Sequence, residues 1–385
     1  MTKKISKVRN GQLDFFKFLF SIVVLLYHGR LLGSASAGDR IIFQNGLISV
    51  EFFFMVSGFF FIPSVERFFE KSSHLNKYNS VFKENIGYIG NKIKSILGLY
   101  IISVVFSFVM YTIYYVKQVT EFNIVSYIFR MSKSIWNILL LQSSVTTQLN
   151  INSVTWYISA MFIVMFILYP VVRCKKDLFV RYICPIGSIL LLGVLVAEKN
   201  SFDNYDDMTA IHLTKGLIRA FIGIMISCII YEVSNYCKEI KFTPFSKLLF
   251  SLVGYAALLY SLVLMDYHTR AILDKNYDWE VNITVIFALA VTTFVFASGL
   301  DITNKLYNNS VSSFLGKLST AIYLLHIPCR RIVQLYFYKG YSYNQRLLIM
   351  LVLSLAVSLI AMFVLFVLRK LSAKIKPTIK RAFLK

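Results

Sequence analysis

The 385-residue chain has few cysteines and few acidic residues. Its five cysteines show no paired spacing, so the sequence indicates neither a disulfide framework nor a zinc site. Asp and Glu number 19 against 41 Lys and Arg, which gives a formal net charge of +22. No segment between the apolar stretches is long enough to hold a core of its own, so a separate soluble domain is excluded.

Apolar side chains are abundant. Hydrophobic residues make up 57% of the chain, against about 45–50% in soluble domains, and a membrane-crossing helix needs roughly 17–25 of them in a run. We therefore expect an all-α integral membrane protein of about ten transmembrane helices bundled around a polar cavity. The expected spans are 13–33, 46–64, 96–116, 154–172, 179–197, 213–231, 245–265, 281–299, 312–337 and 346–369. The segments at about 65–95 and 117–153 are predicted to be loops that carry short amphipathic or re-entrant helices.

The positive charge is distributed unevenly along the chain. Most basic residues lie in 1–12, 67–94, 173–181, 238–247 and 370–385, whereas the segments 198–207 and 266–280 are acidic. This asymmetry is typical of the positive-inside rule, so we expect both termini in the cytoplasm and basic contacts with anionic lipid. No nucleic-acid partner is expected. The predicted organisation is a basic N-terminus (1–12), one transmembrane domain (13–369) and a basic tail (370–385).

The N-terminus also resembles a cleavable signal peptide. Basic residues at 3–9 precede an apolar run and the sequence Ala35-Ser36-Ala37. Asp14 and Lys17 interrupt the approach to that run, and nine further spans follow it. We therefore expect the first span to be retained.

Two histidines lie inside these apolar segments. His28 ends FKFLFSIVVLLYH, and His326 lies within FLGKLSTAIYLLHIPCRRIVQLYF. Charged side chains at membrane depth cost roughly 2.5–3.5 kcal/mol each, so ionisable residues there usually face a protein interior or a wet cavity. Lys17 precedes His28 by eleven residues, about 16 Å along a helix and on roughly the same face. The alternative is that the Lys17 side chain extends to the inner membrane–water interface and that His28 lies in the outer interface.

Other spans contribute ionisable groups in the same range of depth. Glu51 lies near the start of the second span, Arg219 in the sixth, and Arg330 and Arg331 about one turn after His326. The arginine pair has an alternative role at lipid headgroups. Together these residues predict a shared polar cavity, which suits either proton-coupled transport or acid–base chemistry at an acceptor hydroxyl.

Four segments, in order, resemble those of the membrane-bound acyltransferase family 3. They are LDFFKFLFSIVVLLYH, GLISVEFFFMVSGFFF, KIKSILGLY and LGKLSTAIYLLHIP. WYISAMFIVMFILYP, which begins at Trp156, matches a variant found in the family. The chain departs from the family pattern at four positions: Lys17 stands for an arginine, Ser95 for a second arginine, Gly98 for a proline, and Met161 for a glutamate. Lys94 is a plausible substitute for the second arginine.

This resemblance implies an enzyme, an O-acetyltransferase or related O-acyltransferase of the bacterial cytoplasmic membrane. Its donor would be cytoplasmic acyl-CoA, with acetyl-CoA expected. No metal cofactor is expected. The acceptor would be a hydroxyl of an extracytoplasmic polysaccharide or glycolipid. The residues implied for the donor are Lys17, Lys92, Lys94 and Tyr100. A non-catalytic relative that exports a glycan or solute stays as the alternative, and a homo-oligomer is left open.

The resemblance also implies catalytic roles. His28 would act as a general base, with a transient acyl-histidine as the competing route. From depth in the spans alone, and not from the resemblance, Glu51 is expected to orient His28, and Arg219, His326 or Arg330 to stabilise the oxyanion. Ser57, Trp156 and Arg331 complete the set of residues expected to face the substrate.

Overall fold

The structure is a computed structural model, and it describes residues 10–33, 41–74, 77–119, 122–144, 149–198, 202, 205–266 and 278–382. These residues are helical or irregular and form no strand, only an isolated bridge between Met208 and Thr214. The expected all-α class is confirmed. The basic residues at 3–9 and the Ala-Ser-Ala sequence at 35–37 lie outside the described residues.

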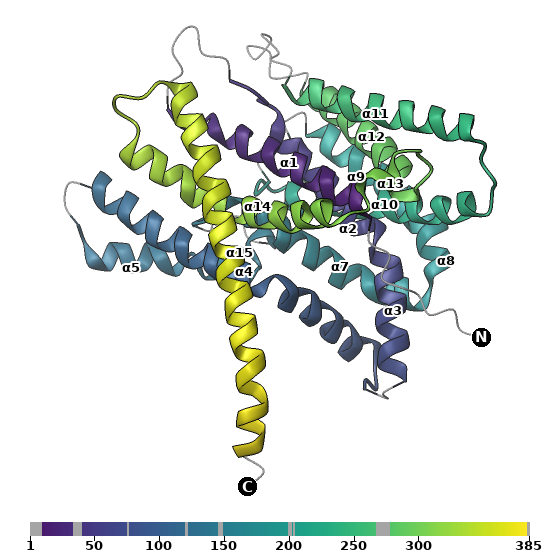
Figure 1. Ribbon diagram of the computed structural model, residues 1–385, viewed down its shortest axis with the longest axis horizontal. Coiled ribbons are helices and arrows are strands. Elements are labelled where there is room, and N and C mark those ends of the chain that lie inside the picture. The colour runs from purple at the N-terminus through teal and green to yellow at the C-terminus, as the bar shows by residue number, and fades with distance from the viewer. Residues whose placement is uncertain are drawn as a thin grey trace.

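Long helices make up most of the chain (Figure 1). They are α1 (Gly11–Gly29), α2 (Val50–Phe59), α3 (Phe61–Ser73), α4 (Val81–Gln118), α5 (Ile124–Ser132), α7 (Trp156–Cys174), α9 (Cys184–Ala197), α10 (Lys215–Lys238), α11 (Pro244–Asp266), α12 (Asp278–Ser298), α14 (Ser310–Tyr336) and α15 (Tyr343–Ala382). Shorter pieces are η1 (Gly46–Ser49), α6 (Ile135–Ile138), η2 (Gln142–Ser144), η3 (Ser153–Thr155), α8 (Lys176–Leu178), η4 (Phe179–Ile183) and α13 (Asn304–Tyr307).

Within the described residues, nine helical segments are long and apolar enough to cross a membrane. The tenth expected span, 312–337, corresponds to α14. With 27 residues α14 extends about 40 Å, which is enough to cross a bilayer, but its polar residues keep it out of the nine. It packs against α1, α4 and α15, and its polar residues Ser312, Ser319, His326 and Arg331 are buried.

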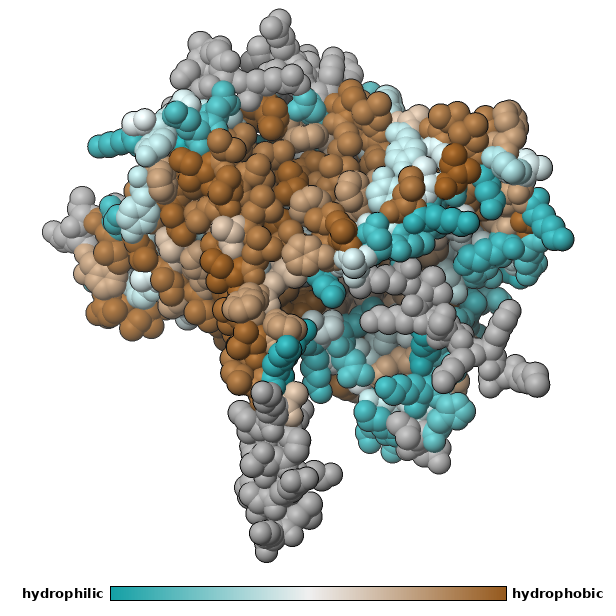
Figure 2. Space-filling view, viewed as in Figure 1, coloured by the Kyte–Doolittle hydropathy of each residue, from teal (hydrophilic) through white to brown (hydrophobic). Residues whose placement is uncertain are grey.

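The rest of the bundle is built around α10, which packs against α2, α7, α9 and α12. Figure 1 shows α15 crossing in front of α4, and these two helices also touch. The face drawn in Figure 2 carries a broad hydrophobic area. Such a surface is expected where helices meet lipid rather than water.

Two helices differ from the expected spans. The predicted loop before residue 96 is helical, and α4 continues through it without a break. Glycine at position 98 permits this continuity, whereas a proline there would remove a helical hydrogen bond. The second span is interrupted at Phe60, between α2 and α3. Pro63 explains the interruption, because it has no N–H to donate to the carbonyl of Phe59.

Two glycines allow the helices that carry the site to approach closely. A Cβ atom on Gly316 of α14 would lie 2.6 Å from Oδ1 of Asp14 on α1. A Cβ atom on Gly58 of α2 would lie 2.6 Å from the carbonyl oxygen of Ile224 on α10. Small residues at such crossings let membrane helices pack backbone to backbone.

Candidate active site

His28 and His326 lie side by side on α1 and α14. Their ring centroids are 5.1 Å apart and the ring planes are perpendicular. Both are buried, at 7% and 0% exposure. The helices run parallel, since Ser319 bonds to the Lys17 carbonyl and Gln334 bonds to the Leu31 carbonyl. The structure thus brings together the two histidines that the sequence had placed within apolar segments.

The hydrogen bonds of His326 define its tautomer. Its Nδ1 lies 3.0 Å from the carbonyl oxygen of Ile322. Because a carbonyl only accepts, Nδ1 donates, and Nε2 of the neutral ring carries a lone pair. Among the described residues neither Nε2 of His326 nor Nδ1 of His28 has a hydrogen-bond partner. Two imidazole nitrogens are therefore buried and available for proton transfer.

A cavity of about 330 Å³ lies between α1, α2, α4, α7 and α14. Its lining is largely apolar and includes Lys17, Ser57, Lys92, Tyr157, Thr320 and Tyr323. A pocket of this kind, apolar with a few placed polar groups, is typical of a small-molecule site. The cavity is where two of the sequence-predicted donor residues meet.

The two lysines of the cavity have different partners. Nζ of Lys17 lies 2.5 Å from Oδ1 of Asp14, and Nζ of Lys92 lies 5.1 Å from the ring centre of Tyr88. Arg67 of α3 is near enough for its charge to act on Lys92. Lys17 is therefore paired with a carboxylate, whereas the charge acting on Lys92 is that of another cation.

The other two donor candidates lie elsewhere. Lys94 is exposed, and the Tyr100 hydroxyl donates to the carbonyl of Asn137. Neither residue is part of the lining of this cavity. Tyr100 is buried, so its visible role is to join α4 to α6.

Aromatic rings connect the cavity with the histidine pair. Tyr157 lies 5.6 Å from Tyr323, and Tyr323 lies 6.2 Å from His326, measured between ring centres. The Tyr157 hydroxyl is 3.1 Å from the Ser57 hydroxyl, and the Tyr323 hydroxyl donates to the Val154 carbonyl at 2.9 Å. These bonds hold both tyrosine rings between the cavity and His326.

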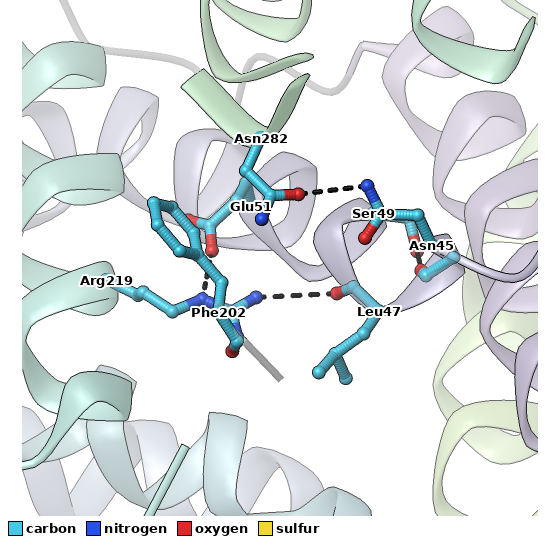
Figure 3. A network of polar contacts seen from close by, with 8 residues as sticks. Asn45, Leu47, Ser49, Glu51, Phe202, Arg219 and Asn282 are labelled. Carbon is cyan, nitrogen blue, oxygen red and sulfur yellow. Dashed lines mark hydrogen bonds and ion pairs between the residues drawn. The ribbon is translucent and has the colours of Figure 1, made fainter. Parts of the chain in front are cut away.

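Glu51 and Arg219 form a fully buried ion pair. Nε of Arg219 lies 2.6 Å from Oε1 of Glu51, and both side chains have 0% exposure. Figure 3 shows the guanidinium of Arg219 between Glu51 and the Leu47 carbonyl; a further bond goes to the Phe202 carbonyl at 2.7 Å. The structure thus pairs two candidates for which the sequence had suggested separate roles, and it commits three nitrogens of Arg219 to bonds.

Trp156 belongs to the same cluster. Its ring stacks on Tyr205 at 4.9 Å and lies 5.1 Å from the guanidinium carbon of Arg219. Its side chain is 1% exposed and is not part of the lining of the cavity described above. Glu51, Arg219 and Trp156 therefore tie together α2, α10 and α7.

Arg330 and Arg331 follow His326 on α14. Nη1 of Arg331 donates to the Ser107 carbonyl at 3.2 Å, and its guanidinium lies 5.0 Å from the ring centre of Tyr111. Nε and Nη1 of Arg330 are buried without a hydrogen-bond partner among the described residues. Arg331 thus contacts α4, which is more than the headgroup role considered for the pair.

Comparison with known families agrees with this arrangement. A family model described as an acyltransferase domain matches residues 10–367, nearly the whole chain. The chain belongs to acyltransferase family 3. No curated protein and no solved structure matches it. The expected family is thereby confirmed, and the chain is a multi-pass membrane protein with an acyl-transfer domain.

Membership of acyltransferase family 3 implies an acyl donor. The cavity is lined mainly by apolar side chains, with the cations Lys17 and Lys92 among them. No cluster of three or more His, Cys, Asp or Glu side chains that could hold a metal ion occurs in the part of the chain that the structure describes.

Sequence reasoning did not select Tyr157, Thr320 or Tyr323 as site residues. A signal for two of them was present, because Thr320, Tyr323 and His326 recur at intervals of three on one helix and thus share a face. The family resemblance includes both Trp156 and Tyr157, and only Trp156 was expected to face the substrate. Adjacent residues on a helix point in different directions, so only the structure separates their environments.

Proposed function

We propose that this protein is an O-acyltransferase of the bacterial cytoplasmic membrane. It takes an acyl group, acetyl in the first instance, from acyl-CoA on the cytoplasmic side and transfers it to a hydroxyl of a cell-surface carbohydrate. The observation that carries the proposal is the buried pair of His28 and His326 next to the cavity lined by Lys17 and Lys92.

The donor would enter at the end of the cavity that carries Lys17 and Lys92. Their ammonium groups suit the phosphates of CoA through charge-assisted hydrogen bonds. Because Lys17 is paired with Asp14, a phosphate would share its ammonium group with that carboxylate. The pantetheine arm would then follow the apolar wall toward Tyr323 and bring the thioester to the histidines.

His28 would act as the general base. It removes the proton from the acceptor hydroxyl as that oxygen forms a bond to the thioester carbonyl carbon. The tetrahedral intermediate collapses, the carbon–sulfur bond breaks, and the proton passes from His28 to the CoA thiolate. The lone pair on Nε2 of His326 can hold the acceptor or His28 in position. The hydroxyls of Ser57 and Thr320 in the cavity lining are neutral groups that could donate to the developing oxyanion, whereas the Tyr157 hydroxyl donates to the Phe53 carbonyl.

The ion pair of Glu51 with Arg219 would serve the site by holding α2 against α10. All three guanidinium nitrogens of Arg219 are bonded, one of them to Oε1 of Glu51, whereas Oε2 of Glu51 has no partner among the described residues. The bonds of Arg219 are suited to fix helix positions. We therefore assign Glu51, Arg219 and Trp156 to the frame of the site and not to contact with the substrate.

Labelled acetyl-CoA tests the proposal. Membranes that contain the protein should transfer label to a glycan acceptor, and His28→Ala should lower the rate about 10²–10⁴-fold, as expected for the loss of a general base. His326→Ala should lower it as well, whereas His74→Ala, at an exposed position after α3, is the matched control.

Three other results would give different answers. Normal transfer by correctly folded His28→Ala would refute the proposed base. Export of a glycan without incorporation of label would favour the transporter alternative. Label that stays on the protein without acceptor, and is lost in His28→Ala, would indicate an acyl-histidine route.

A further inference from the structure

Arg330 of α14 is a partly buried cation with no ion pair among the described residues. Two of its nitrogens, Nε and Nη1, are buried and unpartnered among the described residues. Its neighbour Arg331 differs, because Ser107 and Tyr111 of α4 satisfy that guanidinium. A buried polar group without a partner is destabilising, and a charged one more so. Such a group is expected to bind an anion.

No described carboxylate offers itself. The ion pairs found among the described residues use Asp14, Glu51, Glu66, Glu84, Asp207 and Glu232. Among the described residues, the charge of Arg30 acts on Arg330, and the charge of Arg330 acts on Arg331. Three cations thus gather at the ends of α1 and α14.

This cationic group lies on the far side of the histidines from the donor cavity. Along α14 the order is Thr320 and Tyr323, which line the cavity, then His326, then Arg330. Arg330 follows His326 by four residues, about 6 Å along the helix, and its charge acts on both histidines. A group bound to Arg330 therefore approaches the histidine pair from the side opposite to the acyl donor.

We propose that Arg330, supported by Arg331 and Arg30, binds a carboxylate or phosphate group on the acceptor, so that the acceptor is an acidic sugar. The inference rests on the proposed acyl transfer and specifies its acceptor. One sugar unit can place its anionic group on the guanidinium and a ring hydroxyl at the histidine pair. Arginine suits this role because its planar fork binds carboxylate and phosphate with two parallel hydrogen bonds.

Equilibrium binding to the purified full-length protein in detergent tests the inference. Glucuronate and glucose are the probes, since they share a ring and differ in one carboxylate. Glucuronate should bind at least tenfold more tightly than glucose, the equivalent of about 1.4 kcal/mol. Arg330→Gln should abolish this preference, and Arg330→Lys should reduce it, because lysine keeps the charge and loses the fork.

The control is Arg369→Gln, which removes an exposed arginine from α15 and should leave the preference unchanged. Glucose 1-phosphate should behave like glucuronate. Equal affinity for glucuronate and glucose would overturn the inference. So would a preference that survives in folded Arg330→Gln, or inorganic phosphate that binds as tightly as the phosphorylated sugar.

The binding measurement is independent of catalysis. His28→Ala should lose acyl transfer and still bind glucuronate more tightly than glucose. If wild-type protein transfers no acyl group but keeps the preference, the proposed function fails and the anion site stands. If it acylates glycans but binds the acidic sugar no better than the neutral one, the anion site fails by itself.

Discussion

The ion pair between Glu51 and Arg219 gives the sharpest test of how the site is held. At a separation of 2.6 Å and an effective dielectric constant of about 20, the attraction is about 6 kcal/mol before the cost of desolvating both ions is subtracted. Removal of one partner leaves a buried, uncompensated charge. We therefore expect Glu51→Gln and Arg219→Met each to lower the free energy of unfolding by about 3–5 kcal/mol.

The double variant Glu51→Leu/Arg219→Met should be far less destabilised than either single variant. Apolar groups of similar volume often replace a buried ion pair at little cost or with a gain in stability. Denaturant unfolding of the purified protein in detergent measures all three free energies. The control is Glu239→Gln, which removes an exposed carboxylate at the end of α10.

Acyl transfer per folded molecule then separates a structural role from a catalytic one. If Glu51 and Arg219 only hold α2 against α10, the folded double variant keeps its rate within about tenfold of wild type, or about 1.4 kcal/mol in barrier. Stability equal to wild type in Glu51→Gln would refute the energetic reasoning. A folded, stable double variant without activity would place one of the two residues in the chemistry.

Other predictions follow from the cavity and from helix packing. Lys92→Gln should raise the KM for acetyl-CoA about tenfold but not the KM for acetyl-pantetheine, which has no phosphate. Lys94→Gln is the control, and an equal rise in KM for both donors would contradict the proposed contact of Lys92 with the CoA phosphates. Gly316→Ala should lower thermal stability, because its Cβ would meet α1 at 2.6 Å, whereas Gly90→Ala meets nothing within 4 Å; equal melting temperatures would count against this packing. Cys174, exposed at the end of α7, should react with an impermeant maleimide only from the cytoplasmic side when it is the sole cysteine present; labelling from outside would reverse the proposed topology.

Much of the fold could be predicted because the bilayer imposes length and polarity on each span. Nine of the ten expected ranges correspond to the apolar helical segments of the described residues, and the tenth corresponds to α14. The range 245–265, for example, is α11. Ends and breaks were harder to predict. The break at Phe60 and the continuous α4 depend on single residues, Pro63 and Gly98, whose effects an apolar window averages away.

The site divides in the same way. The order of residues along the chain is enough to place His28, Glu51, Arg219 and His326 within apolar segments, where an ionisable group needs a protein or aqueous neighbour. The folded bundle identifies those neighbours: His28 meets His326, and Glu51 meets Arg219 across 168 positions of sequence. Spacing along one helix sets only depth and face, because the partner depends on which helices pack together and how each is rotated.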